Sequence, residues 1–476
     1  RRSGTRCAMD ERSLVFVTAG VITCYFLIQV LWRRFDPFAP VWLFLVGYAQ
    51  IYIVQALSYH EWAVSAHGSA VVMAANFRAL WGLIWFLIVY HLRFGPRLAT
   101  VLPKPPQSWS CTLVTVISPV LILWGLYCAG VMVRTGGQSS EPVSAEMSLL
   151  QSFPFVMLVA AIMLIVTART SPLVYNVFLI SGLGVAFSYV SIWMFNGKRS
   201  HSLIGVLCTV CVFYISRQRR PSWLVLLVTS FTGALVVALA IGWRNNTTYE
   251  RSLTGFAQYL AEFKPERILQ SLNIEDPEEE PAFITYETEE YGGFLLMMDT
   301  VPEKSDFDYG ANYLRTFTTM IPRVLWPSKP IFGRQQWIAA WIAGSELERD
   351  EDFTSPSIGL LGATQLNGGA VGTGIVLACV AILLRSAYEY FRRYAHLPWA
   401  QFWWAIFFYN AWFMVVCDDP MVWFYYNWGF TTCPIVVFFW VALRFVSPPL
   451  GQGTEDQPVG NGSLEIRGKG TAALLT

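Results

Sequence analysis

The chain has 476 residues, of which 54% are hydrophobic, 16% aromatic and only 14% charged, and its formal net charge is +1. Soluble domains carry about a quarter charged residues, so this composition excludes a single soluble core. The near-neutral charge argues against a nucleic-acid partner. Runs of about 20 apolar residues instead predict an all-α polytopic integral membrane protein, because helices satisfy their own backbone polar groups in lipid.

The apolar segments predict about eleven transmembrane helices in two blocks. We expect these helices at residues 14–32, 40–58, 72–92, 112–133, 153–168, 174–195, 203–216, 223–243, 369–385, 399–416 and 428–446. The chain then divides into an N-terminal transmembrane bundle of about eight spans (1–243), one large extracytoplasmic loop with short helices (244–368), about three C-terminal spans (369–446) and a disordered cytoplasmic tail (447–476).

The cysteines give no sign of a metal or redox centre. Most of the nine lie inside apolar segments, where a thiol behaves as a small hydrophobe. Cys208 and Cys211 form a CxxC pair, but it falls in the middle of a predicted span and has no second pair to complete a metal site. We therefore expect no metal and no cofactor.

The distribution of Lys and Arg predicts the orientation in the membrane. Basic residues in short connections mark the cytoplasmic side. Here they fall in alternate connections, at Arg33, Arg34, Arg93, Arg97, Lys104, Arg169, Arg217, Arg219, Arg220, Arg385, Arg392 and Arg393. This pattern makes the large loop extracytoplasmic, although the four arginines before the first span oppose that orientation.

Some cations fall on the predicted outer side. Lys198 and Arg199 lie between the sixth and seventh spans, and Arg78 lies in the outer half of the third. A miscounted span would explain the first pair, and snorkelling toward head groups would explain Arg78. The functional interpretation is an anion site, because charges within a membrane are costly and usually line a cavity.

The most informative part of the large loop is YGANYLRTFTTMIPRVLWPSKP, at residues 309–330. Pro322 ends a predicted helix, so Arg323 stands at its terminus, and Trp326 and Lys329 follow among prolines that fix a turn. Arginine binds phosphate in a bidentate manner and lysine acts as a point charge. The segment SPSIGLLGATQLNGGAVGTG (355–374) then leads into the ninth span, and its glycines allow close packing or an unusual backbone.

Together these residues suggest that the outer face handles a lipid-diphosphate-linked saccharide. Cations suit a diphosphate, and aromatic faces beside polar groups suit sugar rings. The candidate substrate-binding residues are Arg78, Lys198, Arg244, Tyr309, Arg315 and Trp326.

The stretch YLRTFTTMIPRVLWPSKP resembles a segment in the large periplasmic loop of bacterial O-antigen and exopolysaccharide repeat-unit polymerases (Wzy-type). The glycine-bearing segment 355–374, and Arg199 within GKRSHSLIGVL, are also similar to features of that family. The resemblance implies a metal-independent, GT-C-like membrane glycosyltransferase of the bacterial inner membrane. Such a polymerase transfers a growing glycan from undecaprenyl diphosphate to an incoming undecaprenyl-diphosphate-linked repeat unit, alongside a flippase and a chain-length regulator.

The resemblance also implies roles for individual residues. Arg199, Arg323 and Lys329 would be catalytic, because they would hold the leaving diphosphate and stabilise its developing charge. A carboxylate would deprotonate the acceptor hydroxyl, and the sequence leaves Glu289, Glu290, Asp299 and Asp308 open for this role.

Three alternatives remain open at the level of sequence. An O-antigen ligase would use a histidine in the large loop, where this chain has none. A metal-dependent GT-C glycosyltransferase using a polyprenyl-phosphate sugar could bind a cation through Asp418 and Asp419. A polysaccharide flippase or transporter would be expected to show an internal repeat, and none is evident.

Overall fold

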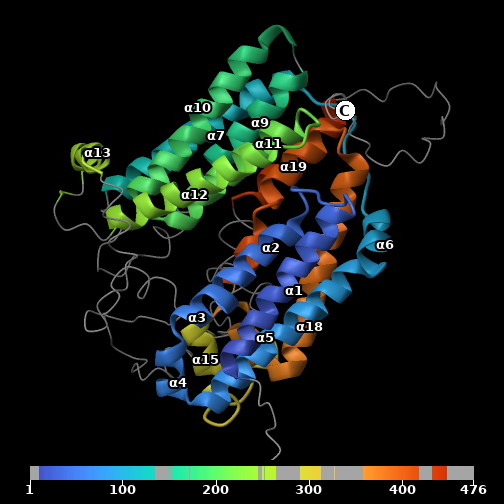
Figure 1. Ribbon diagram of the computed structural model, residues 1–476. Coiled ribbons are helices and arrows are strands. Elements are labelled where there is room, and N and C mark those ends of the chain that lie inside the picture. Colours follow the sequence, from blue (N-terminus) through green and yellow to red (C-terminus); the bar gives the residue numbers. More distant parts are fainter. Residues whose placement is uncertain are drawn as a thin grey trace, which may run out of the picture.

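A computed structural model describes residues 10–134, 150, 153–170, 172–244, 249–250, 252–263, 290–311, 313, 326, 357–417 and 431–446. Within these ranges the chain forms helices, turns and connections, and contains no β-strand (Figure 1). The predicted all-α class is therefore confirmed for the part of the chain that is described.

Two groups of helices make up the molecule. One contains α1 (Glu11–Leu31), α2 (Pro40–Ala49), the π-helix η1 (Gln50–Gln55), α3 (Ala56–Ser58), α4 (His60–His67), α5 (Ser69–His91), α6 (Phe94–Val101), α15 (Glu290–Thr300), α18 (Gly359–Tyr394) and α20 (Asn410–Val416). The other contains α7 (Cys111–Arg134), α9 (Phe155–Thr170), the 3₁₀ turn η2 (Pro172–Val174), α10 (Tyr175–Phe195), α11 (Arg199–Ile215), α12 (Trp223–Arg244), α13 (Leu253–Ala261) and α19 (Pro398–Phe407). The last described helix is α22 (Cys433–Val446).

Local sequence explains where several helices begin. Asp10 caps α1 by accepting a hydrogen bond from the backbone N–H of Arg12 at 3.4 Å, and Glu11 places negative charge in the first turn. Pro40 and Pro398 open α2 and α19, at the position where a missing N–H costs nothing.

Seven helical segments in the described ranges are long and apolar enough to cross a membrane: 11–31, 40–58, 69–91, 111–133, 172–195, 223–244 and 359–394. The remaining predicted spans correspond to shorter helices, namely α9, α11, the pair α19 and α20, and α22. Residues Phe155 to Ala168 of α9 are all buried, as expected of a helix that is apolar on every side and enclosed by others. The count of about eleven spans stays a prediction.

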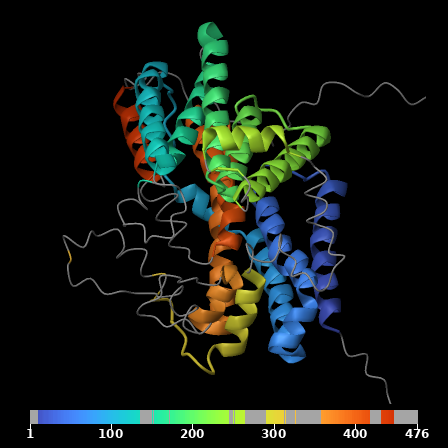
Figure 2. The same cartoon turned by 90° about the vertical axis from the view of Figure 1, so that its left-hand side faces the viewer.

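Large apolar side chains cover the outside of several long helices. Leu123 is 68% exposed, Phe187 75%, Leu224 72% and Phe231 70%. Soluble proteins rarely expose such surfaces, whereas lipid accepts them at no cost. In Figure 2, α18 (orange) runs through the middle of the molecule and α1 (dark blue) lies at its edge.

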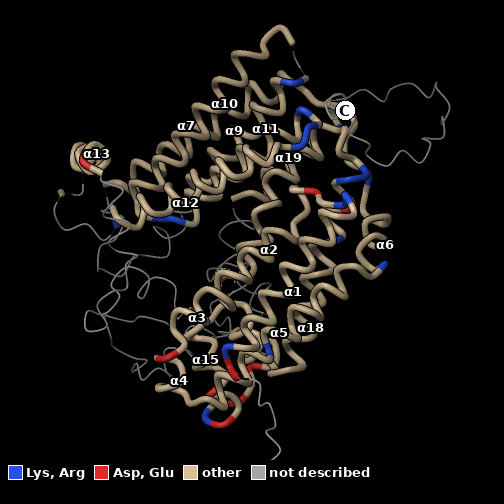
Figure 3. Tube along the Cα trace, viewed as in Figure 1, with Lys and Arg blue, Asp and Glu red and all other residues tan. Residues whose placement is uncertain are grey.

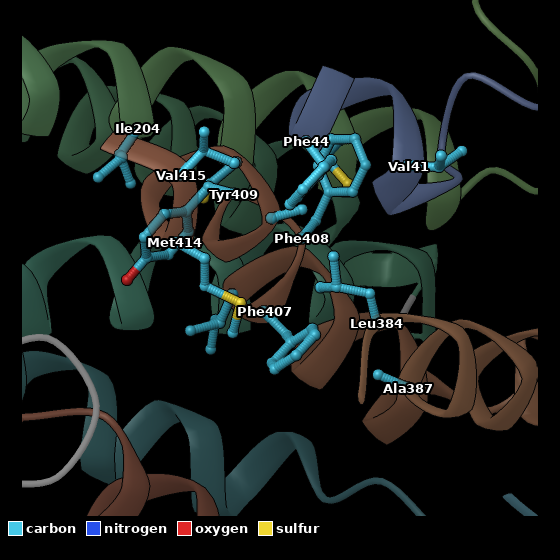
Figure 4. Packing of buried hydrophobic residues seen from close by; sticks show 14 of the residues in the cluster. Val41, Phe44, Ile204, Leu384, Ala387, Phe407, Phe408, Tyr409, Met414 and Val415 are labelled. Atoms are coloured by element: carbon cyan, nitrogen blue, oxygen red, sulfur yellow. The ribbon is translucent and has the colours of Figure 1, made fainter. Parts of the chain in front are cut away.

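The buried core joins the two groups of helices. Figure 4 shows Phe44 of α2 and Leu384 of α18 in the same cluster as Ile204 of α11. Phe44 also stacks on Phe86 of α5, with ring centroids 3.7 Å apart. Aromatic residues are frequent in this core, which therefore gains both buried area and ring-on-ring packing.

The bundle has two ends of different character. The C-terminal ends of α1, α5, α11 and α18 meet at one end, and we call it the basic end because Arg33, Arg34, Arg219 and Arg393 lie there (Figure 3). The N-terminal ends of α1, α5 and α18 lie at the opposite end, which we call the break end because α18 is interrupted there. The side of the membrane that each end faces stays a prediction.

Candidate functional site

The interruption of α18 falls at Gly368 and Gly369, where the predicted large loop ends. Gly368 has φ 168° and ψ 24°, and Gly369 has φ 59° and ψ −134°, so the helix stops and then resumes. The backbone of Gly369 strongly favours glycine, and a Cβ there would also lie 3.2 Å from the ring of Phe307. At Gly372 a Cβ would lie 2.7 Å from the carbonyl oxygen of Thr364. The glycines of this segment thus permit both the unusual backbone and the close packing that the sequence suggested.

Arg78 of α5 fastens the two halves of α18 together. Its Nη1 donates to Oε1 of Gln365 at 2.9 Å, before the break, and to Oγ1 of Thr373 at 3.2 Å, after it. The hydroxyls of Thr364 and Thr373 add a second link across the break, at 2.9 Å. Among the described residues, no carboxylate lies within 4 Å of the half-buried Arg78 guanidinium. Its charge is therefore held by neutral oxygens and remains uncompensated.

The first residues of the 309–330 stretch pack against this break. The backbone N–H of Asp308 donates to the carbonyl of Leu366 at 2.9 Å, and that of Gly310 donates to Oδ1 of Asn367 at 3.2 Å. The first bond satisfies a backbone carbonyl at the end of the first half of α18, where an intrahelical partner is missing, and the second engages the side chain of the next residue. Tyr309 has a left-handed φ of 47° and its side chain is 81% exposed. The stretch therefore presents an accessible aromatic ring beside the break.

A buried polar network lies among α1, α5, η1 and α15, near the start of α18. The carboxylate of Glu290 is buried and accepts a 2.8 Å hydrogen bond from Nε2 of Gln55, whose Oε1 accepts from the backbone N–H of Tyr291 at 3.0 Å. The Tyr291 hydroxyl donates to Oδ1 of Asn76 at 2.8 Å, and Nδ2 of Asn76 donates to the carbonyl of Glu11 at 3.1 Å. Gln55 ends the π-helix, a form often found at functional sites. The network joins α1, α5, α15 and η1 around one carboxylate.

Burial within this network changes the pKa of the Tyr291 phenol. The side chain is almost fully enclosed, and burial raises its pKa, while the hydrogen bond to Asn76 lowers it to a smaller degree. Burial disfavours the charged phenolate, so the phenol stays protonated and remains a donor.

A second carboxylate of α15 is placed differently. Oδ2 of Asp299 lies 3.6 Å from Nδ1 of His67, and the Asp299 side chain is 36% exposed. Two residues further on, the carbonyl of Val301 accepts from Nε2 of Gln365 at 2.8 Å, and this is the glutamine that binds Arg78. The accessible carboxylate of Asp299, beside the His67 imidazole, thus lies two residues from Val301, which Gln365 links to Arg78 at the break.

The remaining described cations of the predicted site form a separate cluster in the second group of helices. Lys198 precedes α11, Arg199 opens it, and Arg244 ends α12. Gly197 allows the start of α11 and the end of α12 to approach closely, because a Cβ at this position would lie only 2.8 Å from Cβ of Arg244. His201 stacks on the buried Trp193 at 4.2 Å. In Figure 3 the C-terminal end of α12, which carries Arg244, lies apart from α5, which carries Arg78, so the described cations of the predicted site belong to two separated elements.

Three predicted residues, Arg315, Arg323 and Lys329, lie outside the described part of the chain. Trp326 is described only as a half-buried residue without regular secondary structure. Glu289, one of the base candidates, also lies outside the described part of the chain, as do Asp418 and Asp419.

Sequence reasoning missed the polar partners inside the apolar segments. Gln365 and Thr373 accept the hydrogen bonds of Arg78 at the break, and Gln55 and Asn76 hold the buried network of Glu290 and Tyr291. Their signal was available, since amide side chains inside predicted spans are expensive and usually face the interior of a bundle. What the sequence could not supply was the pairing between them.

Comparisons of this chain with protein-family models, with curated proteins and with solved structures each found no match.

Proposed function

We propose that this chain is a membrane glycosyltransferase that polymerises lipid-linked oligosaccharide repeat units at the break end of the bundle. The observation that carries the proposal is the uncompensated guanidinium of Arg78, held across the α18 break by Gln365 and Thr373. A charge in such a position usually marks a substrate pathway, and a guanidinium suits the oxygens of a diphosphate. The resemblance of residues 313–330 to a segment of repeat-unit polymerases supports the same substrate class.

In this proposal the reaction replaces a bond to diphosphate with a bond to a sugar hydroxyl. Arg78 binds the undecaprenyl diphosphate of the growing chain at the break, where Arg323 and Lys329 stabilise the negative charge on the diphosphate as it leaves, and Arg199, in the separate basic cluster, binds the diphosphate of the incoming repeat unit. Arg244, Lys198 and Arg315 extend the basic surface, while Tyr309 and Trp326 contact sugar rings. The growing glycan passes to an incoming repeat unit, at the outer face of a bacterial inner membrane.

The geometry favours Asp299 as the base among the described candidates. Its carboxylate is 36% exposed, so an acceptor hydroxyl can approach it, and His67 lies 3.6 Å away to stabilise it or relay the proton. Glu290 is enclosed and already bound by Gln55, which suits a structural role. Asp308 is engaged at the break through its backbone.

A transporter of lipid-linked saccharides is the second candidate. The observation in its favour is the break in α18, because discontinuous membrane helices often form the substrate sites of transporters.

A reconstituted reaction tests the first proposal. Purified chain in lipid vesicles is given undecaprenyl-diphosphate-linked repeat units, and products are separated by length on a gel. We expect a ladder of polymers that persists in a chelator, and Arg78→Gln should lower elongation about a hundredfold, as the loss of one charge-stabilising donor does elsewhere.

Arg12→Gln is the matched control, because Arg12 lies at the same end and pairs with the exposed Glu61 at 3.3 Å. It should leave elongation unchanged. Normal polymer from Arg78→Gln would sink the proposal, and movement of single repeat units across the vesicle without elongation would favour the transporter.

A further inference from the structure

A large cavity opens at the basic end, opposite to the break. Its volume is about 1190 Å³, and its walls come from the C-terminal ends of α1, α5, α11 and α18 together with the start of α2. Ligand sites in proteins typically occupy roughly 300–1,000 Å³, so the space is ample for a small molecule or a lipid head group.

Positive charge gathers on the walls of this cavity. Three pairs of consecutive arginines line it, Arg33-Arg34, Arg219-Arg220 and Arg392-Arg393, and each pair follows or ends a different helix. Arg385 and Lys104 add two further cations from α18 and the segment after α6. Eight cations from four separate parts of the chain therefore face one space.

Negative charge does not balance this set. Asp36 is the one carboxylate among the described lining residues, and its oxygens already accept from the Tyr388 hydroxyl and, at 3.1 Å, from the backbone N–H of Phe38. Glu389 pairs with Arg385 at 2.6 Å and with Arg392 at 3.3 Å. For the other six cations, no described carboxylate lies within 4 Å.

A general preference for basic residues at one side of a membrane explains their presence but not their convergence. Arg33 has φ 54° and Gln218 has φ 49°, both in the left-handed region that non-glycine residues rarely adopt. These two positions line the cavity beside Arg34 and Arg219, and such backbone is retained mainly at functional sites. Nε of Arg385 is buried and has no hydrogen-bond acceptor. The wall thus presents one buried donor that lacks an acceptor among the described residues.

We propose that this cavity binds a multiply charged phosphate group, carried either by a lipid of the adjacent leaflet or by a soluble molecule. Arginine forks match phosphate oxygens in geometry as well as charge. Tyr25, Trp42 and Phe391 supply apolar and aromatic wall beside the cations, which suits a ligand with a hydrophobic or ring-bearing part. The site lies at the other end of the bundle from Arg78 and is independent of the polymerase proposal.

Calorimetric titration of the full chain in a neutral detergent tests the site. The probes are inorganic diphosphate and the water-soluble lipid dihexanoyl phosphatidic acid. We expect saturable binding that weakens with added salt. The triple variant Arg34→Gln, Arg219→Gln, Arg220→Gln should bind about a hundredfold more weakly, because each basic residue near a phosphate surface contributes about 1 kcal/mol.

Two further variants make the outcome decisive. Arg93→Gln, Arg97→Gln removes charge at the same end but outside the cavity lining, and it should change affinity less than about twofold. The triple Arg→Lys variant keeps the charge and should retain most of the binding, which separates loss of a site from loss of folding. Binding of the lipid probe alone identifies a lipid source, and binding of diphosphate as well identifies a soluble source. Absence of binding by both probes, or equal losses in the control and the triple glutamine variant, overturns the proposal.

Discussion

At the break end, one guanidinium is held by two neutral oxygens on a broken helix, whereas at the basic end eight cations surround a cavity with one lining carboxylate. The first arrangement is assembled by long-range hydrogen bonds between helices. The second is assembled by the ends of helices that run in the same direction. Both leave positive charge uncompensated, but the first fixes a single charge in a defined geometry and the second concentrates many charges around open space. The break end therefore suits the binding of one substrate group in a fixed geometry, and the basic end suits a phosphate site that tolerates different ligands.

The break itself should give the largest effect on stability. Gly369→Ala forces a side chain into a backbone region open almost only to glycine and against the ring of Phe307, at a cost of about 2–3 kcal/mol. We expect a lower Tm of the purified protein and lost elongation, with phosphate binding at the basic end preserved. Gly184→Ala in α10 is the control, since a Cβ there meets no atom within 4 Å. Equal Tm values for wild type and Gly369→Ala would show that the break is not constrained.

The buried network should give the next effect. Gln55→Ala removes the donor that satisfies the buried Glu290 carboxylate and should cost about 2 kcal/mol in the free energy of unfolding. A double-mutant cycle with Glu290→Gln, read from chemical or thermal unfolding, should give a coupling energy of about 1 kcal/mol. Additive effects of the two substitutions would mean that the carboxylate and the amide do not depend on each other.

The smallest expected effect is a change in how Tm depends on pH, caused by the buried phenol of Tyr291. Burial raises the pKa of Tyr291, so its folded pKa lies above the unfolded value of about 10. The resulting stabilisation is complete below pH about 10 and is lost as pH rises above that value toward the folded pKa. Tyr291→Phe should remove this part of the dependence of Tm on pH and cost about 1 kcal/mol at neutral pH.

The exposed Tyr309→Phe is the matched control for this measurement and should follow the wild type. Parallel Tm curves for wild type and Tyr291→Phe would contradict the role given to the buried phenol.

Much of the fold was accessible from the sequence. Apolar runs located the long helices, because hydrophobicity along the chain is a local signal. The glycines at 368 and 369 indicated an unusual backbone. The alternation of basic residues indicated that Arg34, Arg219 and Arg393 would share one end, since successive spans reverse direction.

The candidate site was accessible only in part. Arg78 stood out as a charge inside an apolar run, but its partner Gln365 is 287 residues away in the sequence. Glu290 was one of four equivalent carboxylates until Gln55 and the burial of its side chain distinguished it from Asp299. Of the cations predicted to act together at the outer side, the described ones were divided by the fold between two groups of helices, with Arg78 in α5 and Arg199 and Arg244 in α11 and α12.

By itself the sequence determined the class of the molecule, because hydrophobicity and backbone hydrogen bonding leave an apolar chain of this kind little choice but helices. It also determined which connections carry positive charge. Only the tertiary structure decided which charges remain uncompensated, since that depends on the partners brought within hydrogen-bond distance. The break beside Arg78 and the cavity at the basic end both arise from packing between segments far apart in the chain, which no local pattern encodes.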